Sequence, residues 1–378
     1  MKQSPFSFGV LFSQSGTMAV TETAHLQGIL LACEEINNAG GINNRLLDPI
    51  ILDPKSDAST YARMTTELLL RHNVNVIFGC CLSSSRKRVL PIVERFNGVL
   101  FYPSVYEGFE YSPNVIYGGA TPNQMIIPLL EYLFTKGQKK AVLIGTDTLF
   151  AREINRIVAE FLSESGGSFV TKNYVPLGTP KEAFRNIALR TIESQPDIIL
   201  STFVGGEIRK FYESFSELSE SHKLPQIASL TTTESELALL PESARAGHLT
   251  VSSYFGSEDD QPNQKFVELY KSKFGNSRQP SVYTQTTYNQ IHMLSEALKW
   301  SASDSTEDIL SSLSSVSLEV PGGRISLDSN TNHTILKRLI GESNKNGEFK
   351  IVWSSPDFVN PDPYLMSYDR LIVANRMT

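Results

Sequence analysis

Strand-like and helix-like segments alternate along most of the 378 residues, and this alternation limits the folds that the chain can adopt. The short apolar run FSFGVLFS at 6–13 is typical of a buried strand, whereas the stretch at 22–41 has the periodicity of an amphipathic helix. A strand followed by a helix and a further strand favours a parallel sheet with helices on its faces. The sequence therefore predicts an α/β protein.

The alternation occurs in two consecutive series. In the first, the expected strands are 6–13, 49–53, 75–80 and 98–103, and the expected helices are 22–41, 58–71 and 84–96. In the second, the expected strands are 140–147, 168–176, 197–205 and 225–232, and the expected helices include 152–165 and 181–194. A chain of this length exceeds one hydrophobic core of ordinary size, so we expect two lobes, each a parallel sheet flanked by helices.

The segments after the second series are expected to return and complete both lobes. They comprise a strand at 249–254, helices at 264–274 and 282–300, and the strand-like pieces GGRISLD and GEFKIVW. The N-terminal lobe is expected to be 1–120 completed by 252–327, and the C-terminal lobe 121–251 completed by 328–378. The boundary between the lobes is then crossed more than once.

Composition excludes several classes of function. The net charge of -6 and the pI near 5.6 argue against direct nucleic-acid binding, which requires clustered cations. The one basic cluster, Arg86-Lys87-Arg88, is expected to be a solvated helix face. Three cysteines, two of them adjacent at Cys80 and Cys81, cannot form a disulfide framework and suit a reducing compartment.

Nothing in the sequence requires catalysis, a metal or a cofactor. The six histidines have no metal-ligand spacing, and no nucleophile-elbow, phosphate-loop or dinucleotide motif is present. Asp147, Arg152 and Glu153 could form an acid-base group, but they are interpreted as a network at a helix start. We therefore expect a protein that is not an enzyme.

The sequence contains no membrane-spanning run of about 20 apolar residues. The apolar stretch near the N-terminus is short and broken by Ser and Gln, so no signal-peptide core is recognised. These features predict a cytoplasmic protein with no membrane partner. A periplasmic protein whose leader had been replaced by Met would look the same.

The predicted architecture also indicates where a ligand would bind. In open parallel sheets, ligands bind outside the carboxyl ends of the strands. The expected ends are SQSGT, CCLSSS and YPSVYEG in the first lobe, and GTDTLF, TFVGGE and LTTTE in the second. They are rich in hydroxyl, small and aromatic side chains and poor in cations, which favours a small, neutral, polar ligand. The candidate contacts from the later ends are Val204, Thr231 and Thr232.

Each of these signals has an ordinary structural alternative. Serines 83–85 precede a helix, where serine is commonly an N-cap, and capping is compatible with ligand binding. Aromatic residues such as Tyr106, Phe109 and Tyr111 are commonly packing residues. Tyr102 differs from them because it lies at a strand end that faces the expected ligand.

A longer set of segments resembles a known family. The set comprises GVLFSQSGTMAVTET, EEINNAGGINNR, GCCLSSSRKRVLPIVER, YEGFEYSPNVIYGGATPNQ, IGTDTLFAREIN, STFVGG, ASLTTTESEL and NPDPY. Their order is similar to that of the amide-sensing negative regulators of aliphatic amidase operons (AmiC type). These regulators stand close to the urea and short-chain-amide receptors of ABC transporters, in the leucine-binding-protein-like group of periplasmic-binding-protein folds (type I). The piece at 106–124 is the most specific to amide and urea receptors.

The resemblance implies two lobes joined by three crossovers that close on a small amide. Ser83 would hydrogen-bond the ligand, and Tyr102 and Ser104 would form the wall of the first lobe. Ser104 stands where the amide sensor has Thr and keeps the hydroxyl. Residues 148 to 150 would close from the second lobe.

Three departures from the amide sensor reshape the expected site. Cys81, Thr148 and Phe150 stand where that sensor has Tyr, so the pocket loses phenols and the ligand is expected to be bulkier or less polar than acetamide. The implied function is a cytoplasmic sensor that binds a neutral amide and regulates an RNA-binding antiterminator. The alternative is the substrate-binding receptor of a urea or short-chain-amide ABC transporter, which GTMAVTET favours. A homo-oligomer is left open.

Overall fold

The computed structural model describes residues 4–366, whose contacts divide the chain into two compact units. Unit 1 runs up to Val105 and continues with Glu110–Ala120 and Asp259–Leu336. Unit 2 comprises Tyr106–Phe109, Thr121–Glu258 and the chain from Lys337 onwards. The long segments thus change unit near residues 120, 258 and 336, as a fold with three crossovers requires.

The units and the expected lobes differ in three segments. Residues 106–109 and 252–258 lie in unit 2 and residues 328–336 lie in unit 1, whereas the sequence assigned them the other way round. The outermost parts of the expected lobes, 1–3 and 367–378, lie outside the described residues. The lobe boundaries as such stay a prediction.

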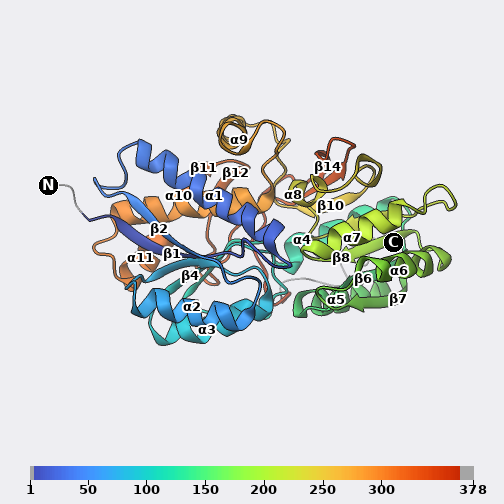
Figure 1. Ribbon diagram of the computed structural model, residues 1–378, viewed down its shortest axis with the longest axis horizontal. Coiled ribbons are helices and arrows are strands. Elements are labelled where there is room, and N and C mark those ends of the chain that lie inside the picture. Colours follow the sequence, from blue (N-terminus) through green and yellow to red (C-terminus); the bar gives the residue numbers. More distant parts are fainter. Residues whose placement is uncertain (1–3, 367–378) are drawn as a thin grey trace. The chain divides into compact units, whose positions relative to one another are not determined.

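Unit 1 contains a sheet of five parallel strands in the order β2-β1-β3-β4-β5 (Figure 1). The strands are β1 (Phe6–Leu11), β2 (Leu47–Leu52), β3 (Val76–Gly79), β4 (Val99–Tyr102) and β5 (Val115–Tyr117). Phe78 of β3 is paired in register with Phe101 of β4, and their rings stack with centroids 4.4 Å apart. This stacking aligns the two strands whose ends carry four of the candidate residues.

Helices complete unit 1 on both sides of its sheet. They are α1 (Ala19–Asn38), α2 (Ala58–Leu70), α3 (Ser83–Arg95), α9 (Gln261–Phe274), α10 (Val282–Trp300) and α11 (Thr306–Leu313), with the hairpin β11 (Ser317–Val320) and β12 (Gly323–Ser326). α1 packs closely on α10 because Gly28 has no side chain. A Cβ atom there would lie 2.1 Å from the Thr284 carbonyl oxygen.

Unit 2 contains a sheet of seven strands in the order β14-β13-β10-β9-β8-β6-β7. The strands are β6 (Lys140–Thr146), β7 (Ser168–Val175), β8 (Ile198–Thr202), β9 (Gln226–Ser229), β10 (Leu249–Ser252), β13 (Leu339–Ser343) and β14 (Phe349–Ser354). The first five in the chain are parallel, whereas β13 and β14 form an antiparallel edge. The chain therefore returns from unit 1 to finish this sheet.

The helical elements of unit 2 are α4 (Pro122–Thr135), α5 (Leu149–Glu164), α6 (Lys181–Glu193), α7 (Gly206–Ser216), the short α8 (Glu234–Leu237) and the 3₁₀ turn Glu242–Ala244. An aromatic group lies at the centre of one face of the sheet. Phe203 is 5.6 Å from Phe184 of α6 and 5.0 Å from Phe211 of α7, measured between ring centroids. This core fixes both helices and the strand end between them.

Helix starts are set by local side chains that accept hydrogen bonds from free backbone N–H groups. Asp57 accepts from the Thr60 N–H at 2.8 Å to start α2, and Asp260 accepts from the Asn263 N–H at 2.9 Å to start α9. Thr233 and Glu236 form a reciprocal capping box at α8. These caps fix where each connection leaves the strand before it.

The α/β class, with two lobes that are each a mainly parallel sheet flanked by helices, is confirmed. The missed elements include β5, β11, β13, α4, α8 and α11. β5 has only three residues, β13 precedes its hairpin partner by a short turn, and α4 is apolar on nearly all sides. Because α4 is buried around its circumference, it has no polar face from which a helical period could be read.

Candidate ligand-binding site

Four candidate residues lie together at the carboxyl ends of β3 and β4, which are neighbours in the sheet of unit 1. Cys81 and Ser83 follow β3, Tyr102 is the last residue of β4, and Ser104 follows it by two positions. Parallel strands bring such ends to one edge of the sheet. The structure therefore brings these four residues together within unit 1, as the sequence predicted. That they bind a ligand stays a proposal.

The turn from β3 into α3 is tight. Cys80 has a positive φ of 68°, and its N–H donates to the Leu11 carbonyl oxygen at 3.2 Å. The N-cap of α3 is Leu82, whose side chain makes no capping hydrogen bond. Ser83 is the first residue of the helix and is buried, so it does not act as the N-cap that the alternative interpretation expected.

Tyr102 is fully buried, and its phenol is held from two directions. The O–H donates to the Cys81 carbonyl oxygen at 2.7 Å, and the Arg86 guanidinium lies 4.7 Å from the ring centroid. The hydrogen bond joins the end of β4 to the turn after β3. The two strand ends are therefore connected by a side chain as well as by the sheet.

Arg86 is not the solvated residue that the sequence predicted. Its side chain is 0% exposed and its Nε donates to Glu110 Oε1 at 2.6 Å, while Lys87 Nζ lies 2.9 Å from Glu110 Oε2. Burial alone would raise the pKa of Glu110, but the two cations hold that pKa below its ordinary value. The expectation failed because Glu110 lies 24 residues further along the chain, where helical periodicity cannot reveal it.

Ser104 is almost fully buried, and its hydroxyl contacts a histidine that the sequence analysis did not single out. Ser104 Oγ lies 2.9 Å from His25 Nε2, and the other ring nitrogen, Nδ1, lies 3.0 Å from the Tyr283 carbonyl oxygen. Burial lowers the pKa of His25 to about 3, so the imidazole is neutral. Three segments that are far apart in the sequence thus meet behind the end of β4.

A buried carboxyl group lies at the neighbouring end of β1. Glu22 of α1 accepts hydrogen bonds from the Ser13 N–H and from the Tyr61 hydroxyl. Burial raises the pKa of Glu22 to about 7 although both hydrogen bonds lower it. This group holds the turn after β1 and is covered by protein.

In unit 2, Thr148 and Phe150 lie at the start of α5, directly after β6. Thr148 is the N-cap of the helix and accepts from the Ala151 N–H at 3.2 Å, and Phe150 is buried. Nearby, Arg152 Nε donates to Asp147 Oδ1 at 2.6 Å, and Arg156 pairs with Glu153 at 3.0 Å. These ion pairs form the helix-start network that was expected. Asp147, Arg152 and Glu153, the residues considered for an acid-base group, are therefore all engaged in ion pairs.

Val204, Thr231 and Thr232 follow the ends of β8 and β9, which are neighbours in the sheet of unit 2. The Val204 N–H donates to Thr146 Oγ1 at 3.0 Å, and the Thr231 hydroxyl donates to the Phe203 carbonyl oxygen. Thr232 Oγ1 lies 3.1 Å from the Tyr212 hydroxyl. All five candidates of unit 2 thus follow the carboxyl ends of the adjacent strands β6, β8 and β9.

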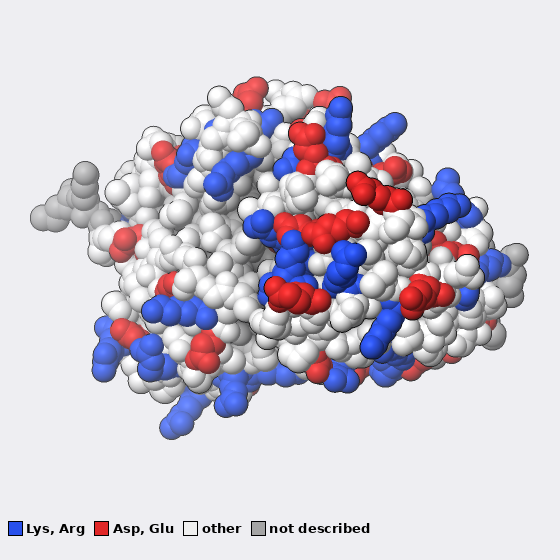
Figure 2. Space-filling model, turned by 45° about the vertical axis from the view of Figure 1, so that its right-hand side comes forward, with Lys and Arg blue, Asp and Glu red and all other residues white. Residues whose placement is uncertain are grey.

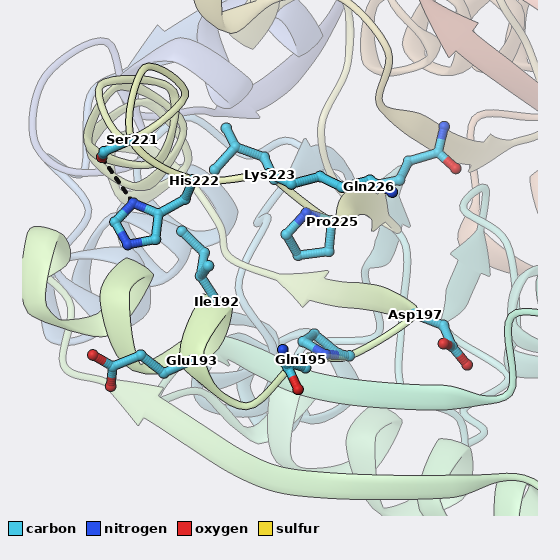
Figure 3. A pocket seen from close by; sticks show the side chains of 11 residues that line it. Ile192, Glu193, Gln195, Asp197, Ser221, His222, Lys223, Pro225 and Gln226 are labelled. Carbon is cyan, nitrogen blue, oxygen red and sulfur yellow. Dashed lines mark hydrogen bonds between the residues drawn. The ribbon is translucent and has the colours of Figure 1, made fainter.

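Figure 3 shows a cavity of about 750 Å³ that none of the candidate residues lines. It lies in unit 2 where α6 leads to β8 and where α7 leads to β9, at the amino ends of both strands. Its lining mixes Glu193, Asp197, His222 and Lys223 with Pro and Leu side chains. Asp197 is already used by the backbone N–H groups of residues 139 and 140. We rank this cavity below the strand carboxyl ends because Ser221 is the one residue with a side-chain hydroxyl in its lining.

The face shown in Figure 2 carries charges of both signs. Lys and Arg side chains are interspersed with Asp and Glu over the face shown in Figure 2. Among residues 4–366, no three His, Cys, Asp or Glu side chains gather as a metal site. Within the same residues, none of the helices has both the length and the apolar character needed to cross a bilayer.

Comparison with known proteins then identifies the family. The chain matches the model of the periplasmic binding protein domain over residues 6–370, nearly the whole sequence. The chain belongs to this family. The periplasmic binding protein described here therefore shares its type I fold with leucine-binding-like proteins.

Two curated relatives illustrate the range of similarity. Leu/Ile/Val-binding protein homolog 6 of Brucella abortus (strain 2308) is 24% identical over 289 residues, which are 74% of this chain and 73% of that protein. Limonene hydroxylase of Geobacillus stearothermophilus is 35% identical over 120 residues, which are 32% of this chain. That match spans only 22% of the hydroxylase, so the activity in its name is not transferred.

Solved structures show the same fold. A solute-binding protein of an ABC transporter from R. palustris, in complex with benzoate, has a TM-score of 0.83 at 18% identity, with 95% of this chain and 98% of that chain covered. The branched-chain amino acid transporter substrate-binding protein LivJ from Streptococcus pneumoniae, in complex with isoleucine, has a TM-score of 0.81 at 19% identity, with 94% and 100% covered. At these identities the likeness shows the fold alone.

At the level of the family, these findings indicate a protein that binds a small molecule and is not an enzyme. The leucine-binding-like relationship agrees with part of the sequence resemblance. The narrower assignment to amide sensors is taken up below as a proposal.

Proposed function

We propose that this periplasmic binding protein is the substrate-binding receptor of an ABC transporter and binds a small organic molecule without net charge. The observation that carries this proposal is the gathering of the candidate side chains at adjacent strand ends in each unit. Ser83, Tyr102 and Ser104 would contact the ligand from unit 1. Thr148, Phe150, Val204, Thr231 and Thr232 would form a second set of contacts.

Within residues 4–366, the arginines beside these candidates, Arg86 and Arg152, are both paired with carboxylates, which supports a ligand without net charge. The charge of Arg86 is balanced by Glu110 at 2.6 Å, and the guanidinium lies over the Tyr102 ring. A carboxylate ligand usually requires an Arg or Lys that is available for pairing. Short amides and urea-like compounds suit hydroxyl, thiol and phenyl groups, and Cys81 in unit 1 and Phe150 in unit 2 would each offer an apolar contact to a larger substituent.

The receptor role accounts for the comparisons better than the regulatory role. The solved neighbours named above are components of transporters, and a receptor that delivers substrate to a permease works outside the cytoplasm. We therefore propose a periplasmic location in place of the cytoplasmic one expected from the sequence. A sensor that binds an antiterminator is the second candidate, supported by the motif at 106–124.

A thermal-shift panel tests the ligand class. The compounds are propionamide, butyramide, urea, benzamide, benzoate and isoleucine, each at millimolar concentration. A compound present at a hundredfold excess over its Kd adds about 2.7 kcal/mol to the free energy of unfolding. We expect the neutral amides to raise Tm most, and a response to none of the six, or to benzoate alone, would overturn the proposed ligand class.

Variants locate the site and cell fractionation tests the role. Ser83→Ala should weaken binding of the responding compound by about tenfold, the effect of losing one hydrogen bond. Lys223→Ala, in the cavity of Figure 3, is the matched control and should leave binding unchanged. Recovery of the native protein only from the cytoplasm, bound to an RNA-binding partner, would favour the sensor over the receptor.

A further inference from the structure

Ser104 presents its hydroxyl in an environment that fixes which way the proton points. The residue is 1% exposed, and its Oγ lies 2.9 Å from His25 Nε2. No other hydrogen-bond partner of Ser104 Oγ occurs in the described part of the chain. The direction of this one hydrogen bond therefore decides what the oxygen offers to a ligand.

The tautomer of His25 follows from the group at its other nitrogen. Nδ1 lies 3.0 Å from the Tyr283 carbonyl oxygen, which can accept a hydrogen bond but cannot donate one. Nδ1 must therefore carry the proton. Burial lowers the pKa of His25 to about 3, so the ring is neutral and Nε2 has no proton.

The packing around the ring keeps this arrangement in place. The His25 ring stacks on Phe12 with centroids 5.0 Å apart and lies 4.9 Å from the Tyr283 ring. A flip of the ring would place carbon atoms against the Tyr283 carbonyl and the Ser104 hydroxyl, and both buried polar groups would lose their partner. The unprotonated Nε2 thus faces Ser104, and Ser104 donates its only proton to it.

Tyr102 is constrained in the same direction. Its hydroxyl lies 2.7 Å from the Cys81 carbonyl oxygen and 3.3 Å from the Val105 carbonyl oxygen, again groups that only accept. After these two donations, Ser104 Oγ and Tyr102 Oη retain only lone pairs. Two neighbouring hydroxyls that could in principle donate or accept are both fixed as acceptors.

We propose that His25 is a positioning residue that makes Ser104 an obligate hydrogen-bond acceptor, so that the ligand group bound there is an N–H donor. The shared chemistry is the –NH₂ of a primary amide or the ammonium group of an amino acid. A carboxylate or carbonyl oxygen is rejected at this point because two acceptors would face each other. This inference rests on the proposed function and adds that the ligand carries an N–H donor where it meets Ser104.

Matched sets of ligands test the inference. Benzamide is compared with benzoate and with acetophenone, in which a methyl group replaces –NH₂ without adding charge. Propionamide is compared with propionate and butanone, and isoleucine with 3-methylpentanoate, which lacks only the ammonium group. By calorimetry, the N–H member of at least one set should bind about 100-fold more tightly than its donor-free partners, since a site built for a donor rejects analogues that lack it.

His25→Phe keeps a ring but cannot accept a proton, so the Ser104 hydroxyl becomes free to donate. The preference for amide over carboxylate should then fall by about tenfold or more. Ser104→Thr keeps the hydroxyl and should keep the preference, whereas Ser104→Ala should lose it. His72→Phe, at an exposed position of unit 1, is the matched histidine control and should change nothing.

Nitrogen NMR of histidine-labelled protein provides a readout that a purely structural role would not affect. The His25 signals, assigned by their loss in His25→Phe, should show a protonated Nδ1 and an unprotonated Nε2. A protonated Nε2 would overturn the inference. Acetophenone binding that is as tight as benzamide binding and is lost in Ser83→Ala would overturn the inference but leave the proposed function standing, while binding of none of the compounds would overturn both.

Discussion

The strand ends of the two units hold their hydroxyl groups by different means. In unit 1, the Ser104 hydroxyl contacts His25 and the Tyr102 ring lies against Arg86, and both partners are side chains from other segments of the chain. In unit 2, the Thr231 hydroxyl donates to the backbone at Phe203, and the N–H groups of residues 231 and 232 donate to Ser229 within the same loop. The geometry of unit 1 is therefore more vulnerable to mutations distant in the sequence, and that of unit 2 is more self-contained.

The largest expected effect comes from Glu110→Gln in unit 1. This change leaves the fully buried Arg86 without its counter-charge, so the free energy of unfolding of unit 1 should fall by about 3–5 kcal/mol. Hydrogen exchange of unit 1 peptides, compared with those of unit 2, measures the effect. Lys87→Gln removes the 47% exposed partner of the same carboxylate and should cost less than about 1 kcal/mol. If both variants lowered the free energy of unfolding equally, the burial of Arg86 would not explain the stabilisation by its pair with Glu110.

Both units contain a buried carboxyl group whose titration should make stability depend on pH. Burial raises the pKa of Glu22 to about 7 and that of Glu234 in unit 2 to about 8. Each group keeps its proton in the folded state where the unfolded chain has released it, so stability falls as pH rises towards the folded pKa. Below pH 6.5 the buried His25 and His248, whose pKa values are lowered, oppose this trend.

Between pH 6.5 and 8 the two glutamates should dominate. The free energy of unfolding should decline by about 2 kcal/mol over this window, at about 1.36 kcal/mol per pH unit for one group. Glu234→Gln should remove most of the decline, and Glu22→Gln a smaller part because its titration ends near pH 7. Urea unfolding at several pH values measures these slopes, and an unchanged slope in Glu234→Gln would contradict the assignment.

A smaller effect is expected in unit 2 from Tyr212→Phe. The variant removes the hydroxyl that lies 3.1 Å from Thr232 Oγ1 but leaves the backbone hydrogen bonds of this loop intact. The loss should be about 1 kcal/mol, the usual value for one hydrogen bond. A loss above about 3 kcal/mol, measured by the same hydrogen exchange, would show that unit 2 also relies on side chains from other segments.

The smallest effect is expected in the cavity of Figure 3. Lys223→Ala and His222→Ala should each change the free energy of unfolding by less than about 0.5 kcal/mol, as is usual for surface positions. Ligand affinity, measured by calorimetry, should stay the same. A tenfold loss of affinity in either variant would move the site from the carboxyl ends of β8 and β9 to their amino ends.

Most of the fold could be predicted because its elements carry local signals. The helix at 282–300 was predicted with the bounds that α10 has, and the predicted helix at 58–71 exceeds α2 by one residue. Elements without such signals were missed, as with α4, which is buried around its circumference, and β5, which has three residues. Pairing over long sequence distances, as between β13 and β10, also left no local pattern.

The candidate site could be predicted only in part. Tyr102 and Thr231 were predicted to lie at the carboxyl ends of their strands, and the structure has them there. This prediction needed only the order of strands and helices along the chain. The residues behind them were missed or misjudged. His25 has no distinguishing sequence context, and Arg86 looked solvated because Glu110, which pairs with it, belongs to a separate loop. These supporting residues reach the site through tertiary contacts between distant segments, and a single sequence does not show which distant segments are in contact.

The three free cysteines make this chain convenient to modify. Cys33 and Cys80 are buried, and burial raises the pKa of both thiols, so neither is readily converted to the reactive thiolate. Cys81 is partly exposed and follows β3 next to the residues assigned to the ligand. A maleimide dye added to the unmodified protein would therefore attach at one place. Its fluorescence would report occupancy of the site and turn the protein into an optical sensor for its own ligand.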